Sequence, residues 1–135
     1  MEIRRATMKD ALDVLAWRND PHTIAMSRTP GIVDQATHLA WFAKAIADQD
    51  RIILIATEDG RRLGMVRFDR SDGAWLVSIN LAPEARGKGY GRAVLTEAMA
   101  VLRASNGPCR LSAEIKGNNA PSLRLFERCG FVQQD

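Results

Sequence analysis

The chain has 135 residues, of which 46% are hydrophobic and 26% charged, and its net charge is +3 at pH 7. This length and composition are typical of one globular domain and too short for two. No apolar run reaches the roughly 20 residues of a membrane span, and no secretory signal opens the chain, so we expect a cytoplasmic protein without a membrane partner. Two cysteines and two histidines are too few to predict a metal site. The modest positive charge also disfavours a nucleic-acid partner.

The first part of the chain predicts a strand and two helices. Strand Glu2–Ala6 is followed by Thr7, which can cap a helix, and by Asp10 in the position of a capping-box acid. The helical spacing of apolar residues then dissolves, and a loop is expected over His22–Gly31. Asp34 is expected to cap the second helix, which carries one apolar stripe.

The rest of the chain predicts more strands than helices. The expected strands are Arg51–Thr57, Leu63–Asp69, Trp75–Ala82, Cys109–Ile115 and a short last one beginning at Phe131-Val132. A hairpin turn is expected at Asp59-Gly60. One helix follows the glycines of residues 87–91, and another follows Asn118-Asn119 and ends at Gly130. The predicted order, β-α-α-β-β-β-α-β-α-β, is a mixed α/β layer without repeats or linkers.

A glycine-rich segment, residues 83–91 (PEARGKGYG), leads into the third helix. Its glycines allow close approach of a ligand, and the helix N-terminus adds unpaired N–H groups and positive dipole charge. Cationic side chains flank it: Arg86, Lys88 and Arg92. The segment lacks the Gly-Lys-Ser/Thr of a Walker loop, and its strand is not the first of a βαβ unit, as a dinucleotide site requires. We therefore predict an anion site, with a ligand-free helix entry as the alternative.

Two segments carry a resemblance to a known family. Residues 79–91 (INLAPEARGKGYG) resemble the acetyl-CoA signature of the GNAT superfamily, Arg-x-x-Gly-x-Gly after a strand that ends in Pro, and residues 118–131 resemble its second motif. The predicted element order also matches, so the resemblance spans essentially the whole chain. It implies the mixed α+β GNAT fold, with a mostly antiparallel sheet that a β-bulge splays at the fourth strand and about four flanking helices. It also implies a single domain over residues 1–135 that lacks the usual last C-terminal strand.

The same resemblance implies an acetyl-CoA-dependent N-acetyltransferase and assigns roles by motif position. The backbone of the loop would hold the pyrophosphate through Arg86, Gly87, Lys88, Gly89, Tyr90 and Gly91. Asn80, Leu81 and Ala82 would run beside the pantetheine arm, and the Leu81 amide would act in catalysis by polarising the thioester carbonyl. Asn118 would help to position the pantetheine or the acceptor.

Further segments resemble a GNAT branch that acetylates nucleotide-linked amino sugars, as in pseudaminic acid biosynthesis. They are Trp17–Pro21, Met26-Ser27, His38-x-x-Trp41-Phe42, Val66-Arg67-Phe68 and Ser78-Ile79. The likeness implies an acceptor pocket near Met26, His38, Ser78 and Glu114, and our hypothesis makes Glu114 the base for the amine proton. Each has a structural alternative: a core position for Met26, a packed or capping role for His38, and a solvated edge position for Glu114.

Two departures from the family pattern bear on the mechanism. Phe126 stands where many GNAT enzymes have a Tyr that is thought to protonate the leaving thiolate; Cys129, a water or release of the thiolate itself are the substitutes. The missing last strand would leave a sheet edge open, which suits a homodimer. The alternative acceptors are a peptide N-terminus, a polyamine or an aminoglycoside, and a non-catalytic acetyl-CoA-binding module is the alternative of a different class.

Overall fold

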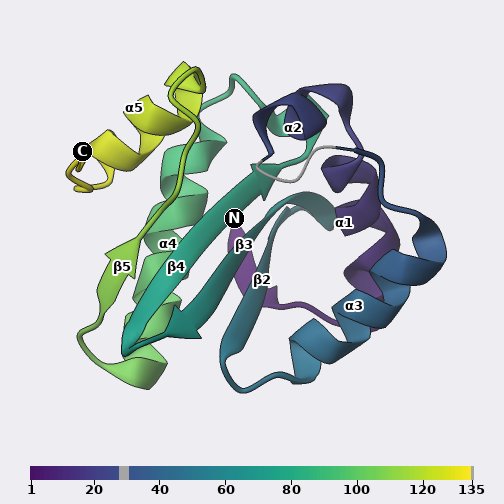
Figure 1. The fold of residues 1–135 in the computed structure, drawn as a ribbon, viewed down its shortest axis with the longest axis horizontal. Helices are drawn as coiled ribbons and strands as arrows, with labels where there is room; N and C mark the ends of the chain where they lie inside the picture. The colour runs from purple at the N-terminus through teal and green to yellow at the C-terminus, as the bar shows by residue number, and fades with distance from the viewer. Residues whose placement is uncertain (28–30, 135) are drawn as a thin grey trace.

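A computed structural model describes residues 1–27 and 31–134 of the chain, which form a five-stranded sheet with helices on both faces (Figure 1). The strands are β1 (Glu2–Arg5), β2 (Arg51–Glu58), β3 (Arg61–Ser71), β4 (Ala74–Leu81) and β5 (Arg110–Ser112), in that spatial order. The helices are α1 (Ala11–Arg18), α2 (Pro21–Met26), α3 (Gln35–Ala47), α4 (Tyr90–Asn106) and α5 (Ala120–Arg128). Neighbouring strands are antiparallel except β4 and β5, which are parallel. The predicted mixed α/β class and mostly antiparallel sheet are confirmed.

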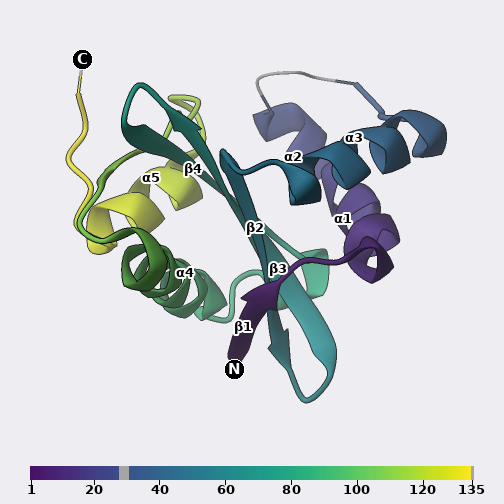
Figure 2. The ribbon, with the colours of Figure 1, turned by 90° about the horizontal axis from the view of Figure 1, so that it is seen from below.

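The sheet separates two helical layers (Figure 2). Helices α1–α3 cover one face, and α4 and α5 cover the other. The amphipathic spacing of α4 explains its docking, because the expected i, i+3, i+4, i+7 stripe is the face that is buried: Leu95, Ala98, Met99 and Leu102, with Val94 beside them. Among the described residues, no helix is long and apolar enough to cross a membrane.

The predicted capping box ties the first strand to the first helix. Thr7 caps a short 3₁₀ turn over Met8–Asp10, and its backbone N–H donates to Asp10. Asp10 is fully buried and accepts hydrogen bonds from Arg4 and Arg62 at 2.7 Å. Burial alone would raise the pKa of Asp10, but the hydrogen bonds from Arg4, the Thr7 amide and Arg62 outweigh it and hold this pKa well below its usual range. The cluster joins β1, the start of α1 and β3.

The loop expected over His22–Gly31 is wrong for its first part, which is helix α2. Asp20 caps that helix, because its carboxylate accepts from the Thr23 backbone N–H at 3.2 Å, and Pro21 occupies the first helical position. A cap followed by Pro is a helix-start signal that the break in apolar spacing concealed. Residues 28–30 of the expected loop lie outside the described residues.

The C-terminal part also differs from expectation. The strand expected over Cys109–Ile115 is only β5, three residues long. Residues 131–134 form no strand; instead Phe131 packs edge-on against Phe126, with ring centroids 5.0 Å apart. The β-bulge expected in β4 is absent from that strand, whose register with β3 is continuous. The irregularity lies in the ladder between β2 and β3, where Ala56 pairs with Gly64 and Thr57 with Arg62, so that Leu63 of β3 has no partner in β2.

Candidate active site

The sheet opens into a wedge between β4 and β5. Only three residue pairs join the two strands: Ala74 with Arg110, Trp75 with Leu111 and Leu76 with Ser112. Beyond them β4 continues to Leu81 while pairing only with β3 on its other side. Within the described ranges, no backbone hydrogen bond joins residues 77–81 to the segment that follows β5. The sheet is therefore splayed at its fourth strand by early loss of pairing rather than by a bulge.

The backbone direction at the end of β4 places the Leu81 amide in the wedge. The Ala82 N–H donates to the Leu63 carbonyl of β3 at 2.8 Å. Successive residues of a strand direct their backbone polar groups to opposite sides, so the Leu81 N–H points away from β3 and toward the wedge. By the same alternation the backbone groups of Asn80 and Ala82 face β3. Leu81 is thus the one of these three residues whose backbone N–H points into the wedge.

The end of β4 requires a glycine on the neighbouring strand. Gly64 is the cross-strand partner of Leu81, and a Cβ at position 64 would lie 2.9 Å from the Asn80 carbonyl oxygen and 3.0 Å from the Leu81 Cα. Because both contacts are with backbone, a side chain there would displace the end of β4. Sequence reasoning missed this residue, since an isolated Gly within a strand is only a weak signal of close backbone approach.

The glycine-rich loop leads from β4 into α4 through a 3₁₀ turn at Pro83–Ala85. The Arg86 N–H closes that turn by donating to Pro83, and no backbone hydrogen bond in the described part of the chain uses the N–H groups of residues 87–92. Gly87 and Gly89 have φ angles of +72° and +81°, and a Cβ at either would meet nothing within 4 Å. The amides of residues 87–92 therefore have no backbone partner in the described chain, and the positive end of a helix dipole lies at this point.

Gly91 differs from the other two glycines of the loop. A Cβ at this position would meet the Leu125 side chain at 3.4 Å and the Leu81 side chain at 3.7 Å. This side of residue 91 therefore faces the packing between α4, α5 and β4. The missing Cβ of Gly91 therefore makes room for this packing, while the part of its backbone amide in an anion site stays a prediction.

The Arg86 side chain was expected to add positive charge to the glycine-rich loop, but it points to the start of α2 instead. Its guanidinium donates to Asp20 at 2.8 Å and to Thr23 at 2.9 Å, at the start of α2. The hydrogen bond from Arg86 is also the main cause that lowers the pKa of Asp20. Thr23 in turn lies 3.4 Å from the Asn80 side chain. The residues Arg86, Thr23 and Asn80 thus connect the loop, α2 and β4, while Lys88 is left as an exposed cation of the loop.

Helix α2 also contacts the other wall of the wedge. The Lys116 ammonium, in the segment after β5, donates to the Ala25 carbonyl of α2 at 3.2 Å. Met26 is the last residue of α2 and is half-buried. Asn118 is exposed in the turn before α5, where its neighbour Asn119 provides the helix cap. Helix α2, which lies where the sequence predicts a loop, therefore spans the mouth of the wedge on this face.

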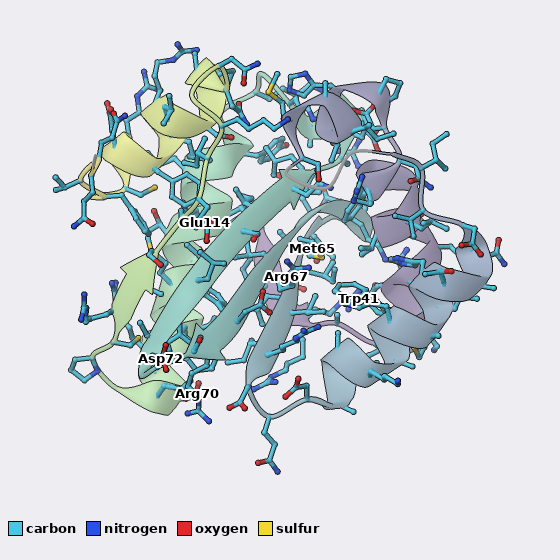
Figure 3. All side chains as sticks on the ribbon, viewed as in Figure 1. Trp41, Met65, Arg67, Arg70, Asp72 and Glu114 are labelled. Atoms are coloured by element: carbon cyan, nitrogen blue, oxygen red, sulfur yellow. The ribbon has the colours of Figure 1, made fainter. Side chains whose placement is uncertain are left out.

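The predicted acceptor residues lie apart from one another. Ser78 is half-buried on the sheet face that also carries Met65 and Arg67 of β3, and Figure 3 shows these two beside Trp41 of α3. Glu114 is exposed, two residues beyond β5, on the other side of β4 in that view. Ser78 and Glu114 thus stand on the two arms of the wedge.

His38 belongs to the core and not to a pocket wall. Its side chain is 4% exposed, its Nε2 atom is 2.8 Å from the Ala11 carbonyl oxygen, and its ring lies 5.6 Å from that of Phe42. A ring nitrogen that donates to a buried carbonyl links α3 to α1. The packed-histidine alternative therefore describes this residue, and the implied acceptor contact is not kept.

The structure offers no hydroxyl at the position of the expected acid. Phe126 is 5% exposed within the core. Cys129, the substitute considered from the sequence, has its Sγ atom 3.9 Å from the Thr96 hydroxyl, between α5 and α4. The single tyrosine, Tyr90, is beside Glu58, whose carboxylate raises the pKa of the Tyr90 hydroxyl by hydrogen bonding. Tyr90 therefore becomes a weaker acid and is directed to the end of β2.

Comparison with known proteins identifies the family of this chain. Residues 1–132 match the family model for the acetyltransferase (GNAT) domain. The chain belongs to the GNAT family. It is 31% identical to the Bacillus subtilis protein named "Putative phosphinothricin acetyltransferase YwnH", over 98% of this chain and 85% of that protein. A GNAT acetyltransferase uses acetyl-CoA, and the enzyme class predicted from the sequence is confirmed.

Solved structures agree with this assignment. The ribosomal-protein-alanine N-acetyltransferase of Brucella melitensis superimposes with a TM-score of 0.83 at 26% identity, over 100% of this chain and 86% of that one. The spermidine N-acetyltransferase of Vibrio cholerae, solved with CoA and spermine, has a TM-score of 0.87 at 17% identity, over 99% and 82% of the two chains. The second likeness shows the fold alone. These relatives differ in acceptor, so family membership leaves the amine of this enzyme open.

Proposed function

We propose that the protein transfers the acetyl group of acetyl-CoA to a primary amine on a nucleotide-linked amino sugar. The observation that carries the transfer is the pairing of an open wedge with an uncapped helix N-terminus: the Leu81 amide points into the wedge, and the unpaired amides of residues 87–92 follow it. The first arrangement suits a thioester arm and the second suits a pyrophosphate. The sequence likeness to the amino-sugar branch and the net charge of +3, which favours an anionic acceptor, support the choice of acceptor.

In the proposed reaction the amine nitrogen attacks the thioester carbonyl carbon, and the carbon–sulfur bond breaks. The Leu81 N–H stabilises the oxyanion that forms at the carbonyl oxygen. Glu114 accepts the proton that the amine loses, directly or through a water. CoA leaves as a thiolate, which takes its proton from solvent, because Phe126 has none to give and a thiol pKa of about 8.5 makes the thiolate an adequate leaving group.

Other acceptors are weaker proposals. A peptide N-terminus is suggested by the Brucella relative, and polyamines and aminoglycosides by the more distant structures. Polycationic amines need an acidic lining, whereas the described sheet face beside the wedge carries the Arg67 guanidinium. A non-catalytic acetyl-CoA-binding module would keep the same cofactor site without turnover.

We also propose that the enzyme is cytoplasmic and acts as a single domain. In the described chain β5 is an edge strand of only three residues, with β4 as its one neighbour. Such an edge is a pairing surface for a second copy, so a homodimer is the proposed assembly. Light scattering measures this directly, and a monomer at working concentration contradicts it.

The test of the proposed function is release of free CoA thiol from acetyl-CoA with a UDP-linked sugar that carries an amine at its fourth carbon. We expect release that depends on the sugar. Glu114→Gln should flatten the alkaline-rising limb of the pH–rate profile, because its amide cannot accept the proton. Glu97→Gln, at a position on α4 that is also exposed, is the matched control and should leave the profile unchanged. An unaltered profile for Glu114→Gln removes it as the base, and no release with any primary amine rejects the enzyme in favour of the binding module.

A further inference from the structure

Arg67 is a half-buried cation on the sheet face beside the wedge. It is the cross-strand partner of Ser78 on β4, and its side chain is 30% exposed. The guanidinium carbon lies 5.4 Å from the ring centroid of Trp41, and its Nε atom donates to Asp69 at 3.0 Å. Figure 3 shows Arg67 beside Trp41. The Trp41 ring and the Asp69 carboxylate therefore hold the guanidinium plane in one orientation.

These contacts leave the two terminal nitrogens of Arg67 available. Asp69 engages Nε, and within residues 1–27 and 31–134 no hydrogen bond is made by either Nη atom. A guanidinium has five N–H donors in a planar fork, which matches the two oxygens of a carboxylate or phosphate. A fork that is oriented by its neighbours and still has free donors is suited to an oxyanion from outside the chain.

The charges around Arg67 do not cancel this preference. Asp69 is shared, because its second carboxylate oxygen lies 3.6 Å from Arg51. Arg51 also lies 3.6 Å from Asp48 at the end of α3, so these groups form a chain of pairs that leads away from the wedge. Met65 and Ser78, the neighbours toward the wedge, carry no charge, and Glu114 stands across β4. Arg86 also reaches this face, but its guanidinium is bound to Asp20 and Thr23. Arg67 differs from it in keeping both Nη atoms without a partner in the described chain.

Arg70, on the same strand, shows what a purely structural arginine looks like here. Its guanidinium also lies over a tryptophan, Trp75, at 5.3 Å. However, its Nε and Nη2 atoms both donate to Asp50, at 3.0 and 2.7 Å, so its fork is occupied by the protein. Arg70 is also on the opposite face of the sheet from Arg67, because their positions differ by three residues. The same three residue types thus give a closed cluster on one face and an open one on the other.

We propose that Arg67 is the residue that recognises the acceptor, by binding an oxyanion that the amine substrate carries. This inference rests on the proposed acetyl transfer and adds the chemical class of the acceptor: an amine with a carboxylate, phosphate or phosphinate group. Leu81 is three residues beyond Ser78 on β4, which is about 10 Å along a strand. The Arg67 side chain spans part of the distance between Ser78 and Leu81. We therefore expect the oxyanion and the amine of the acceptor molecule to be several bonds apart.

The test is calorimetric titration of the CoA-saturated protein with paired amines. One pair is the UDP-linked 4-amino sugar and the same sugar without UDP; the other is phosphinothricin and its carboxamide. We expect at least one anionic member to bind about tenfold to a hundredfold more tightly than its partner, since hydrogen bonds to charged groups have that effect. Which pair shows the preference distinguishes a phosphate from a carboxylate as the recognised group.

The variants decide whether Arg67 is responsible. Arg67→Gln should abolish the preference, and Arg67→Lys should restore only part of it, because an ammonium lacks the planar fork. Arg70→Gln is the matched control, which loses a tryptophan-stacked arginine without touching the acceptor face, and should keep the preference. Thermal unfolding of both Gln variants confirms that they are folded.

The outcomes separate this inference from the proposed function. A preference that survives in Arg67→Gln overturns the inference, as does a wild-type protein that binds neither member of either pair or both members equally. CoA release is measured on the same samples. If the wild-type enzyme acetylates amines without any preference for the anionic members, the proposed transfer stands and the role of Arg67 fails; if it acetylates no amine, the proposed transfer itself fails.

Discussion

The N-termini of α3 and α4 contrast directly. At α3 the Asp34 carboxylate accepts from the Thr37 backbone N–H at 3.3 Å, so the chain itself satisfies the first amides. At α4 the position before the helix is Gly89, in a left-handed conformation with no side-chain cap. Helices α2 and α5 are capped in the same way as α3, by the side chains of Asp20 and Asn119. Helix α1 has no side-chain cap of its own, but it continues directly from the 3₁₀ turn that Thr7 caps. Among the described helices, α4 is therefore the one whose N-terminus neither a side chain nor a preceding capped turn closes, as the proposed cofactor site requires.

The largest effect is expected from a carboxylate placed at the uncapped N-terminus of α4. Gly89→Asp should weaken acetyl-CoA affinity about a hundredfold or more, because a negative charge then meets the pyrophosphate at short range. Titration of acetyl-CoA measures it. Gly73→Asp is the matched control: Gly73 has a φ of +76° and equally open surroundings at the β3–β4 turn, so backbone strain is matched and only the location differs. Equal losses in the two variants would attribute the effect to strain.

The start of α2 is an intermediate case, because its cap also binds the loop. Asp20→Ala removes the cap and the partner of Arg86, and we expect a loss of about 1–2 kcal/mol in the free energy of unfolding. Asp20→Asn should recover most of this loss through capping alone. Acetyl-CoA affinity should change less than threefold in both, because neither side chain reaches residues 87–92. A loss approaching that of Gly89→Asp would show that α2 is part of the cofactor site.

The smallest effect is expected at α3. Asp34→Ala should lower the unfolding midpoint by a few degrees and leave acetyl-CoA affinity unchanged. Hydrogen bonds from the Thr37 hydroxyl and backbone lower the pKa of Asp34 below its unfolded value. The cap therefore stabilises the fold above about pH 4 and loses this contribution as the pH falls through the folded pKa. The difference in midpoint between wild type and variant should shrink in acid, and a constant difference would contradict the capping role.

Much of the fold could be predicted because its signals are local. Thr7 with Asp10, Asp34, the Asp59-Gly60 turn and the α4 stripe each depend on a few neighbouring residues, and the structure has them where they were expected. The length of β5 and the absence of a last strand could not be predicted in this way. Whether an apolar segment becomes a strand depends on a pairing partner, and beyond Ser112 β4 no longer provides one.

The same distinction between local and distant contacts decides which parts of the candidate site could be predicted. The loop of residues 86–91 is contiguous, so its glycines and the following helix could be recognised from the sequence. The Arg86 side chain, in contrast, binds Asp20, and the free fork of Arg67 depends on Trp41 in another element. Such contacts between distant segments have no local signature, which is also why the sequence leaves both a packed role and an acceptor role open for His38.

The three-pair ladder between β4 and β5 has a consequence for local stability. Pairing of eight positions holds β3 to β4, whereas the arm of the wedge that begins at Arg110 depends on three. An element with so few backbone bonds opens at a lower free energy than the rest of the sheet, so the amides of residues 110–112 should exchange with solvent hydrogen faster than those of β2 and β3. A ligand that contacts both arms closes this weak point, and the wedge then becomes more rigid when it is filled than when it is empty.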